Sequence, residues 1–290
     1  FITGQGILPK SYIRRRPNGT VLEVRSEPLP NGGIVQSYTD ITELTQSTEA
    51  AEAGARAQSA FLATMSHEIR TPLNGVLGMA TLLRQSALSK EQLEWGRIIS
   101  ESGDALMSVI NDILDFSKIE ANRIELEEKS FDVSQIFENI ESLYKTVAED
   151  KGLFFKINKD SSVPQLVYGD AVRYKQILIN LVANAIKFTD SGSVLINVSA
   201  CNTDDKQILI TTEVKDTGIG IKNENIDKLF DSFLQLDSST TKKYTGTGLG
   251  LAIAKSFCTM MGGEINVESQ FGKGSSFILK IPFKLPIDEM

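Results

Sequence analysis

The stretch FLATMSHEIRTPLNGV, residues 61–76, decides how the rest of this chain is organised, because it holds the only histidine of the 290 residues, His67. On a helix that turns about 100° per residue, apolar residues of this region fall on one stripe and His67 falls on the opposite side among small residues. His67 is therefore expected to face solvent, with room for a large anionic reactant. The stripe consists of Phe61, Met65, Ile69, Pro72, Val76, Ala80 and Leu83.

A lone histidine is usually a structural residue, but the neighbours of His67 favour a chemical role. A neutral imidazole presents a lone pair on one nitrogen when the other nitrogen is tied up. Glu68, the next residue, is placed to accept that ring proton. The pair therefore favours a neutral imidazole with one lone pair available.

The segment Ser66–Leu73 resembles the dimerisation and phosphoacceptor helix of sensor histidine kinases, whose motif runs Ser-His-Glu-hydrophobic-Arg-Thr-Pro-Leu, and it matches that motif at every position. The resemblance implies that His67 attacks the γ-phosphate of ATP and that Glu68 acts as its base. It also implies that Thr71, with Glu68, supports dephosphorylation of a partner response regulator.

Composition indicates a globular chain long enough for two domains, with 41% hydrophobic and 23% charged residues. A net charge of −7 without a basic cluster argues against binding to nucleic acid or to an anionic membrane. Cys201 and Cys258 have no CxxC spacing, and a single histidine argues against a zinc site. We expect a cytoplasmic fragment without direct membrane contact, whose parent protein, since the chain opens at Phe1, could carry an anchor elsewhere.

The N-terminal residues 1–43 alternate like strands, and 21–25 with 33–38 read as a β-hairpin. The three arginines at 14–16 indicate a solvated strand face. The ending Asp40-Ile41-Thr42-Glu43 resembles the exit of a PAS sensor domain, of which only the last strands are present.

A heptad seam begins at Leu44 and runs without a skip into the histidine helix. Between Thr48 and Gln58 the seam is small or polar, so residues 44–60 predict a weak coiled coil. One interpretation is a passive linker; our hypothesis is a bistable segment that transmits rotation of the sensor to His67.

A second helix is expected after a short loop, with Ser89 as its N-cap and its end near Glu120. An antiparallel hairpin cannot bury both of its faces alone, so we expect a homodimeric four-helix bundle. The seam of the second helix consists of Ile99, Ser102, Leu106, Val109, Ile113 and Phe116.

Beyond a polar hinge at 121–130 the pattern becomes α/β. The expected helices are 131–150, 170–189 (capped by Asp170) and 248–261, and the expected strands are 153–157, 193–200, 207–214, 264–268 and 276–283.

No GxxxxGK[ST] sequence is present, which excludes a P-loop kinase on pattern. Instead, Asn180, Asn184 and Lys187 form one polar edge of the helix 170–189. Amide oxygens suit Mg²⁺ and a lysine suits phosphate. The same edge could also be simply a solvated face.

Three further motifs follow. Asp216-Thr217-Gly218-Ile219-Gly220 could be a turn, or a carboxylate that binds the adenine amino group beside glycines that let the backbone approach the ring. Phe230 and Phe233 could dock a mobile loop or belong to a core helix. Gly246-Thr247-Gly248-Leu249-Gly250 opens an apolar helix, where unpaired N–H groups would meet phosphate, although it could be only a tight turn. The Ser/Thr/Lys-rich residues 235–245 are typical of a nucleotide lid, from which Lys242 or Lys243 could reach phosphate.

In order and spacing these motifs resemble the N, G1, F and G2 boxes of the HATPase catalytic domain of histidine kinases, a GHKL ATPase, and the resemblance covers about 59–285. It implies Asn184 as the Mg²⁺ ligand, Lys187 at the phosphates and Asp216 at adenine. Thr245 departs from the pattern, because many members have a glycine there. The implied ATP-binding residues are Asn180, Asn184, Lys187, Asp216, Gly218, Gly220, Phe230, Phe233, Gly246, Thr247, Gly248, Leu249 and Gly250.

We therefore expect a multidomain chain: PAS-like strands (1–43), a signal helix (44–60), a HisKA phosphotransfer hairpin (61–123) and an α/β sandwich ATP-binding domain (124–290). The expected activity is that of an ATP- and Mg²⁺-dependent protein-histidine kinase. It would autophosphorylate His67, pass the phosphoryl group to an aspartate of a receiver domain, and also act as a phosphatase of that partner.

Two other classes fit parts of the sequence. A GHKL clamp of the gyrase, heat-shock chaperone or mismatch-repair kind would hydrolyse ATP to close a dimer, but it has no use for an exposed histidine on a bundle. A non-enzymatic signalling dimer with a degenerate ATP site is disfavoured because Asn184, Asp216 and the glycines of both loops are present together.

Overall fold

The computed structural model describes residues 11–30, 32–86, 88–121, 123–203, 206–234 and 247–286. The chain divides into two compact units, 1–63 and 64–290. The predicted lid at 235–245 and Gly246 lie outside the described residues, as do the side chains of the seam residues Ala51 and Ala55.

The first unit contains an antiparallel sheet of three described strands in the order β1-β2-β3, followed by the start of helix α1. The predicted hairpin is confirmed as β2 paired with β3. Every residue of β1 is exposed, which agrees with a solvated arginine face. The strands are β1 (Ser11–Arg15), β2 (Val21–Pro28) and β3 (Ile34–Asp40).

Helix α1 (Thr42–Arg84) starts from a compact junction with the sheet. The Asp40 carboxylate accepts hydrogen bonds from the hydroxyl of Thr42 at 2.6 Å and from its backbone N–H at 3.0 Å. These bonds hold the pKa of Asp40 below its usual range. The Thr42 hydroxyl oxygen in turn accepts from the backbone N–H of Val21 at 2.8 Å. The Asp-Ile-Thr sequence thus ties the first turn of α1 to strand β2.

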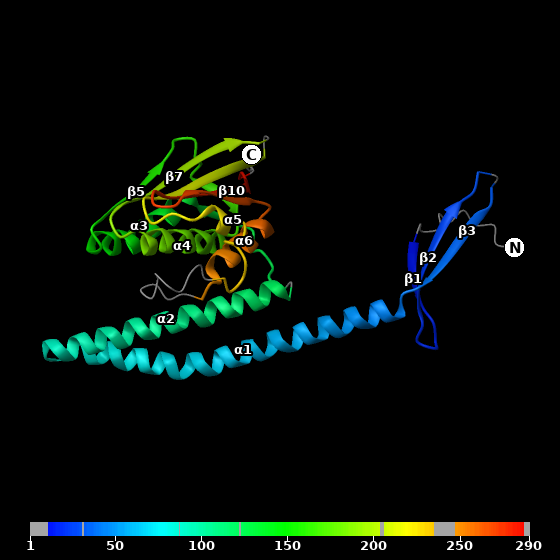
Figure 1. Cartoon of the computed structure of the whole chain (residues 1–290), viewed down its shortest axis with the longest axis horizontal. Helices are drawn as coiled ribbons and strands as arrows, with labels where there is room; N and C mark the ends of the chain where they lie inside the picture. Colours follow the sequence, from blue (N-terminus) through cyan, green and yellow to red (C-terminus); the bar gives the residue numbers. More distant parts are fainter. Residues whose placement is uncertain are drawn as a thin grey trace. The chain divides into compact units, whose positions relative to one another are not determined.

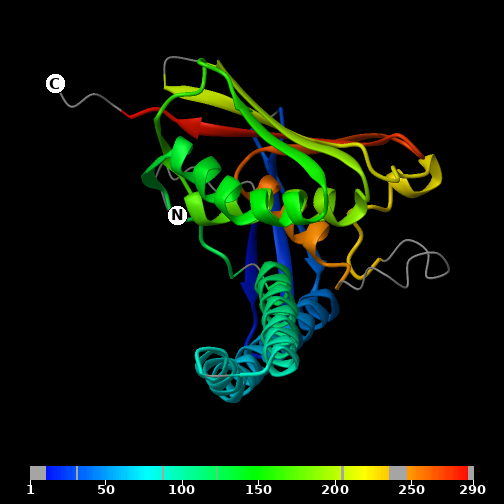
Figure 2. The same cartoon turned by 90° about the vertical axis from the view of Figure 1, so that its left-hand side faces the viewer.

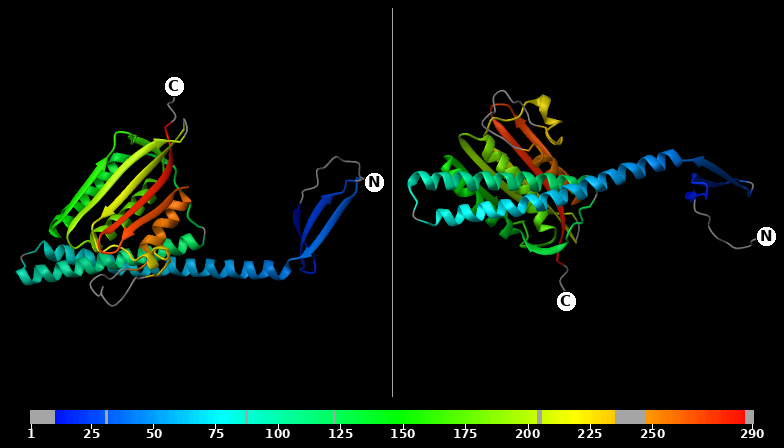
Figure 3. Two further views of the ribbon diagram at one scale, coloured as in Figure 1. Left: turned by 45° about the horizontal axis from the view of Figure 1, so that its top comes forward. Right: turned by 90° about the horizontal axis from the view of Figure 1, so that it is seen from below.

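In the second unit, α1 continues through Pro72 and lies antiparallel beside α2 (Lys90–Glu120), as Figure 3 shows. The predicted N-cap is confirmed: the Ser89 hydroxyl accepts from the Gln92 N–H at 3.2 Å. The Gln92 side chain accepts from the Ser89 N–H at 2.9 Å, which completes a capping box.

The contact between these two helices does not use the predicted apolar seam. The buried residues of α2 are instead Gly96, Gly103, Ile110 and Ser117, which are spaced by seven and mostly small. On α1, Arg84 lies against Gly96 and Leu77 lies against Gly103. A Cβ added to Gly103 would lie 2.5 Å from Cδ2 of Leu77, so the helices approach closely there. The predicted seam positions Ile99 and Leu106 stay 44% and 46% exposed within the single chain.

The rest of the second unit confirms the predicted α/β pattern with two corrections. The helix expected from Phe131 begins at Val133, because Asp132 caps it by accepting from the Ser134 N–H at 2.7 Å, and residues 129–132 form a strand. The partner of that strand, β6, was not predicted. The elements are β4 (Lys129–Asp132), α3 (Val133–Asp150), β5 (Leu153–Lys159), β6 (Leu166–Gly169), α4 (Ala171–Phe188), β7 (Gly192–Asn202), β8 (Gln207–Asp216), α5 (Asn223–Ile226), α6 (Gly250–Met260), β9 (Glu264–Gln270) and β10 (Gly274–Lys284).

Seven described strands form one sheet in the order β4-β6-β10-β8-β7-β5, with β9 on β10. Helices α3, α4 and α6 lie along one face, so the module has a sheet layer and a helix layer (Figures 1 and 2). The predicted strand pairs β7–β8 and β9–β10 are antiparallel, whereas β5 runs parallel to β7. The apolar core between the layers includes Tyr174, whose buried hydroxyl lies 2.9 Å from that of Thr212.

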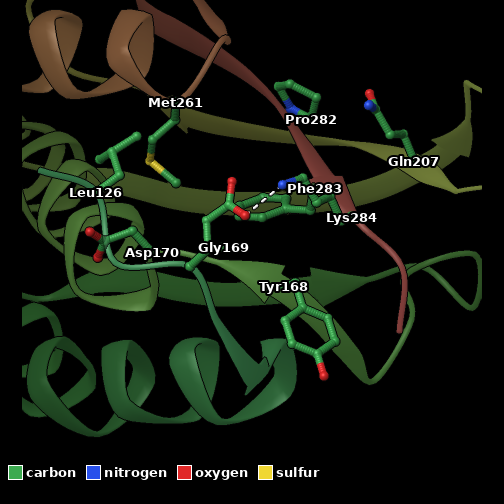
Figure 4. A pocket seen from close by; sticks show the side chains of 10 residues that line it. Leu126, Tyr168, Gly169, Asp170, Gln207, Met261, Pro282, Phe283 and Lys284 are labelled. Atoms are coloured by element: carbon green, nitrogen blue, oxygen red, sulfur yellow. Dashed lines mark hydrogen bonds and ion pairs between the residues drawn. The ribbon is translucent and has the colours of Figure 1, made fainter. Parts of the chain in front are cut away.

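The predicted hinge at 121–130 is too long at its C-terminal end, because Glu127 is bonded to Asp170 and strand β4 begins at Lys129. The Asp170 carboxylate caps α4 by accepting from the Arg173 N–H at 3.0 Å, and it also accepts from the Glu127 N–H at 3.1 Å. A cavity of about 180 Å³ lies beside the segment that holds Glu127, and none of the residues around it belongs to the predicted nucleotide motifs (Figure 4). It is lined by Leu126, Glu128, Tyr168, Gly169, Asp170, Gln207, Met261, Pro282, Phe283 and Lys284.

We expect Gly103→Ala and Gly78→Ala to have opposite effects on stability. Gly78 has nothing within 4 Å of an added Cβ, so alanine there should raise the free energy of unfolding by about 1 kcal/mol through helix propensity alone. At Gly103 the collision with Leu77 should outweigh that gain and lower it by about 1 kcal/mol. Urea unfolding followed by circular dichroism measures both; equal stabilisation by the two variants would refute the close helix contact.

Candidate nucleotide site and histidine surface

His67 is exposed on α1, on the side that the helical pattern predicted. Its backbone carbonyl accepts a hydrogen bond from the Thr71 hydroxyl at 3.1 Å. Glu68 is also exposed, and no hydrogen bond joins it to the imidazole among the described residues. The ring is therefore accessible to a reactant from outside the hairpin.

The register of the hairpin places part of α2 at the level of His67. The Arg70 guanidinium donates to the Asn111 side-chain oxygen at 3.1 Å, and Leu77 lies against Gly103. Because the helices are antiparallel, the residue of α2 opposite His67 falls near 114. Any group docked near that position of α2 therefore lies at the level of the histidine.

Helix α4 carries the first predicted motif. The Asn180 side-chain amide donates to the Gly250 carbonyl at 2.9 Å, which joins α4 to the start of α6. The half-buried amide of Asn184 makes no hydrogen bond within the described part of the chain. Lys187 is also half-buried, and burial lowers its pKa. At the end of the helix, Lys151 Nζ donates to the carbonyls of Ile186 and Lys187 at 2.7 and 3.0 Å, a favourable place for a cation.

Asp216 ends strand β8 and is fixed through one of its two oxygens. Its Oδ1 accepts from the Gly218 N–H at 2.8 Å and from the Ser275 N–H at 3.3 Å, which connects the Asp-x-Gly loop to the glycine turn before β10. Burial raises the pKa of Asp216, while these two bonds act in the opposite direction. Within the described residues Oδ2 has no hydrogen-bond partner, so it can accept from a ligand.

The aromatic motif and the second glycine motif meet at the two ends of the undescribed segment. The Phe233 N–H donates to the Gly248 carbonyl at 3.1 Å, and both residues have positive φ, 63° and 70°. Phe230 is half-buried, with Lys255 Nζ 5.0 Å from its ring centroid. Helix α6 begins at Gly250 without a side-chain cap, which leaves its N-terminus suited to an anion.

The nucleotide motifs also touch α2, through residues that the sequence did not single out for this. The Thr247 hydroxyl donates to the Asp112 carboxylate at 3.0 Å. The Gln176 amide donates to Asp115 at 2.6 Å, and Phe233 packs edge-on against Phe116 with ring centroids 5.4 Å apart. In sequence the two aspartates look like any solvated positions between seam residues, so no local signal marks them.

The structure thus gathers the four predicted motifs in one module. They come from α4, the end of β8, the segment after α5 and the start of α6. The sequence Gly272-Lys273-Gly274-Ser275 also resembles the last glycine turn of the family, but the bond from its Ser275 N–H to Asp216 was not predicted, because a backbone N–H leaves no trace in sequence. Amide oxygens, a lysine, a buried carboxylate and an uncapped helix N-terminus together suit a purine nucleotide with a cation and phosphates.

Three family models match the chain. Residues 57–122 match the His Kinase A (phospho-acceptor) domain, and residues 169–285 match the histidine kinase-, DNA gyrase B- and HSP90-like ATPase. Residues 6–49 match the PAS fold.

The chain is also similar to parts of longer proteins. Hybrid signal transduction histidine kinase B of Dictyostelium discoideum is 45% identical over 290 residues, which cover 97% of this chain and 15% of that protein. Autoinducer 2 sensor kinase/phosphatase LuxQ of Vibrio parahaemolyticus is 39% identical over 261 residues, covering 87% of this chain and 30% of the relative. The chain therefore spans less than a third of each of these proteins.

Among solved structures, full-length ShkA in complex with AMPPNP has a TM-score of 0.63 and 36% sequence identity, covering 80% of this chain and 47% of ShkA. Across the described residues, no helix combines the length and apolar character needed to cross a membrane.

We expect Gly220→Ala to destabilise the module far more than Gly272→Ala. Both glycines have positive φ, 66° and 82°, so both variants carry backbone strain of about 1 kcal/mol. Only at Gly220 would the new Cβ lie 2.1 Å from a backbone oxygen, that of Gln270. Chemical unfolding should show an additional loss of at least about 2 kcal/mol for Gly220→Ala; similar losses for the two variants would contradict this packing.

Proposed function

Because the chain belongs to the sensor histidine kinases, we propose that it is an ATP-dependent protein-histidine kinase whose phosphoacceptor is His67. The observation that carries this proposal is the combination of an exposed imidazole on a helical hairpin with a module in which all four nucleotide motifs converge. A clamp-type ATPase would need the module but not the exposed histidine.

In the proposed site the nucleotide lies between α4 and the start of α6. Asp216 accepts from the adenine amino group through its unoccupied Oδ2. Gly218 and Gly220, expected to let the backbone approach the ring, instead let the loop pack closely on the backbone of Phe188 and Gln270. Lys187 and the N–H groups at the start of α6 bind the phosphates. Asn180 positions α6 through the Gly250 carbonyl, so its role is to hold the site together.

The Asn184 amide suits the proposed Mg²⁺ because its side chain is half-buried and makes no hydrogen bond with the rest of the described chain. Mg²⁺ would neutralise charge that develops on the phosphates during transfer. Asn184 would contribute its oxygen as one ligand.

In the proposed reaction the lone pair of an imidazole nitrogen of His67 attacks the γ-phosphorus of ATP. A nitrogen–phosphorus bond forms, the bond between the γ-phosphorus and the bridging oxygen breaks, and ADP leaves with that electron pair. The proton of the other ring nitrogen is held by Glu68, which requires a side-chain rotation from the observed geometry. Positioning contributes most of the catalysis, because phosphoryl transfer needs little covalent assistance from the protein.

We further propose that the functional unit is a homodimer built on the exposed apolar stripe of the hairpin. Within one chain, α2 buries its line of mostly small residues (Gly96, Gly103, Ile110 and Ser117). Large apolar side chains therefore remain at the surface of α1 and α2. Packing them against a second copy would complete a four-helix bundle. The exposed set includes Met65, Ile69, Val76, Met79, Ile99 and Leu106.

The phosphoryl group of His67 is proposed to pass to an aspartate of a receiver domain, and Thr71 with Glu68 to assist its later hydrolysis. Relatives named as hybrid kinases and as a sensor kinase/phosphatase support this step. The proposed domains keep the predicted limits of 1–43, 44–60, 61–123 and 124–290, with 44–60 as the signal-transmitting helix.

Incubation with ATP and Mg²⁺ should give an acid-labile, alkali-stable phosphoprotein. His67→Gln removes the nucleophile and Asn184→Ala removes the proposed metal ligand, so each should lower the yield at least about 100-fold. Lys175→Ala, on α4 but outside the motifs, is the matched control and should keep wild-type yield. Acid-stable phosphate that persists in His67→Gln would reject the proposal.

Leu106→Glu should convert the dimer into a monomer, because it places a charge in the proposed apolar interface of the bundle. Ser108→Glu, an exposed position on the same helix, is the control and should remain dimeric. Sedimentation equilibrium distinguishes the two, and a dimeric Leu106→Glu variant would contradict the interface.

A further inference from the structure

Helix α2 touches the nucleotide module at three points that together form a docking contact, made by Asp112, Asp115 and Phe116. The Asp115 carboxylate accepts from Gln176 at 2.6 Å and lies 3.6 Å from the Arg173 guanidinium, and its side chain is only 15% exposed. Phe116 meets Phe233 at the edge of the aromatic motif. These contacts place the start of α6 against α2.

The third residue of this contact, Asp112, accepts a hydrogen bond from the hydroxyl of Thr247, a residue of the proposed nucleotide site. A threonine hydroxyl has one proton to donate. In this structure the Thr247 hydroxyl donates it to Asp112 at 3.0 Å, while its oxygen accepts from the Leu249 N–H at 3.2 Å. A phosphate that accepts a hydrogen bond from the Thr247 hydroxyl must therefore replace Asp112 as the acceptor.

Electrostatics acts in the same direction. The Asp112 carboxylate lies at the glycine loop whose backbone would hold phosphate, so a bound polyphosphate would bring negative charge next to it. Burial, and to a smaller extent the neighbouring charge of Asp115, raises the pKa of the Asp112 carboxyl group, while the hydrogen bond from Thr247 acts in the opposite direction. Loss of the docked state on nucleotide binding would relieve both effects.

We infer that Asp112 is an internal competitor for the phosphate-binding residue Thr247, so that docking on α2 and binding of a nucleotide phosphate exclude one another. This inference rests on the proposed ATP site and adds a residue that sets its affinity. Asp115 contributes by holding the docked arrangement through Arg173 and Gln176, although it touches no residue of the glycine loop. The free energy of the docking contact is therefore subtracted from that of nucleotide binding.

The test is the dissociation constant of a non-hydrolysable ATP analogue with Mg²⁺, measured by calorimetry on the whole 290-residue chain. Asp112→Ala removes the acceptor and should tighten binding about three- to tenfold, since a hydrogen bond to a charged group is lost from the competing state. Asp112→Asn keeps a carbonyl acceptor and should give a smaller gain. Asp115→Ala should also tighten binding. Because Asp115 does not touch Thr247, this gain would come from the weakened docking contact and not from a local effect on Thr247.

Asp104→Ala is the matched control, because Asp104 is exposed on the same helix two turns earlier, and it should bind like the wild type. A general loss of structure would weaken binding, so tighter binding cannot come from misfolding. An unchanged or weaker affinity in Asp112→Ala or Asp115→Ala, or an equal gain in Asp104→Ala, overturns this inference but leaves the proposed ATP site standing. Absence of binding in the folded wild type overturns the proposed ATP site and the inference with it.

Discussion

A hydrogen bond from the Asn180 amide to the Gly250 carbonyl, together with the apolar core that α4 and α6 share, joins the first nucleotide motif to the last one. Helix α4 carries the residues proposed for cation and phosphate, and α6 carries the glycine loop. Both ends of α4 are fixed as well, by the Asp170 cap and by Lys151 on its last carbonyls. A second junction at Asp216 joins β8 to the turn before β10. These contacts fix the positions of the elements that carry the proposed site.

The helical hairpin depends on a different constraint, which is the small size of the α2 residues that side chains of α1 contact. Small residues recur at intervals of seven on the buried side of α2, where Leu77 and Arg84 of α1 lie against Gly103 and Gly96, and the larger apolar residues are left exposed. The same hairpin carries the exposed His67 and, on α2, the aspartates that meet the module. The exposed His67, the proposed dimer surface and the docking contact all lie on this one pair of helices, and Phe116 of the predicted apolar seam belongs to the docking contact.

Much of this could be predicted from sequence because local rules dominate. Ser89 and Asp170 caps, the hairpins and the order of the glycine motifs follow from turn and capping chemistry within a few residues. The features that the sequence did not predict depend on contacts between residues that are distant in the chain. Strand β6 is four residues long and exists through pairing with β4 and β10. The intrachain seam was missed because glycine and serine leave no hydrophobic period. The carboxylates of Asp112 and Asp115 acquire a role only when the module lies against α2, which sequence spacing does not encode.

The central claim is that the imidazole of His67 receives the γ-phosphoryl group of ATP. The most direct measurement is phosphorus NMR of the ATP-treated protein at neutral to alkaline pH, combined with mass spectrometric mapping of the modified peptide. We expect a phosphoramidate signal and a modification confined to His67. A phosphate ester on serine or threonine, with His67 unmodified, would contradict the claim.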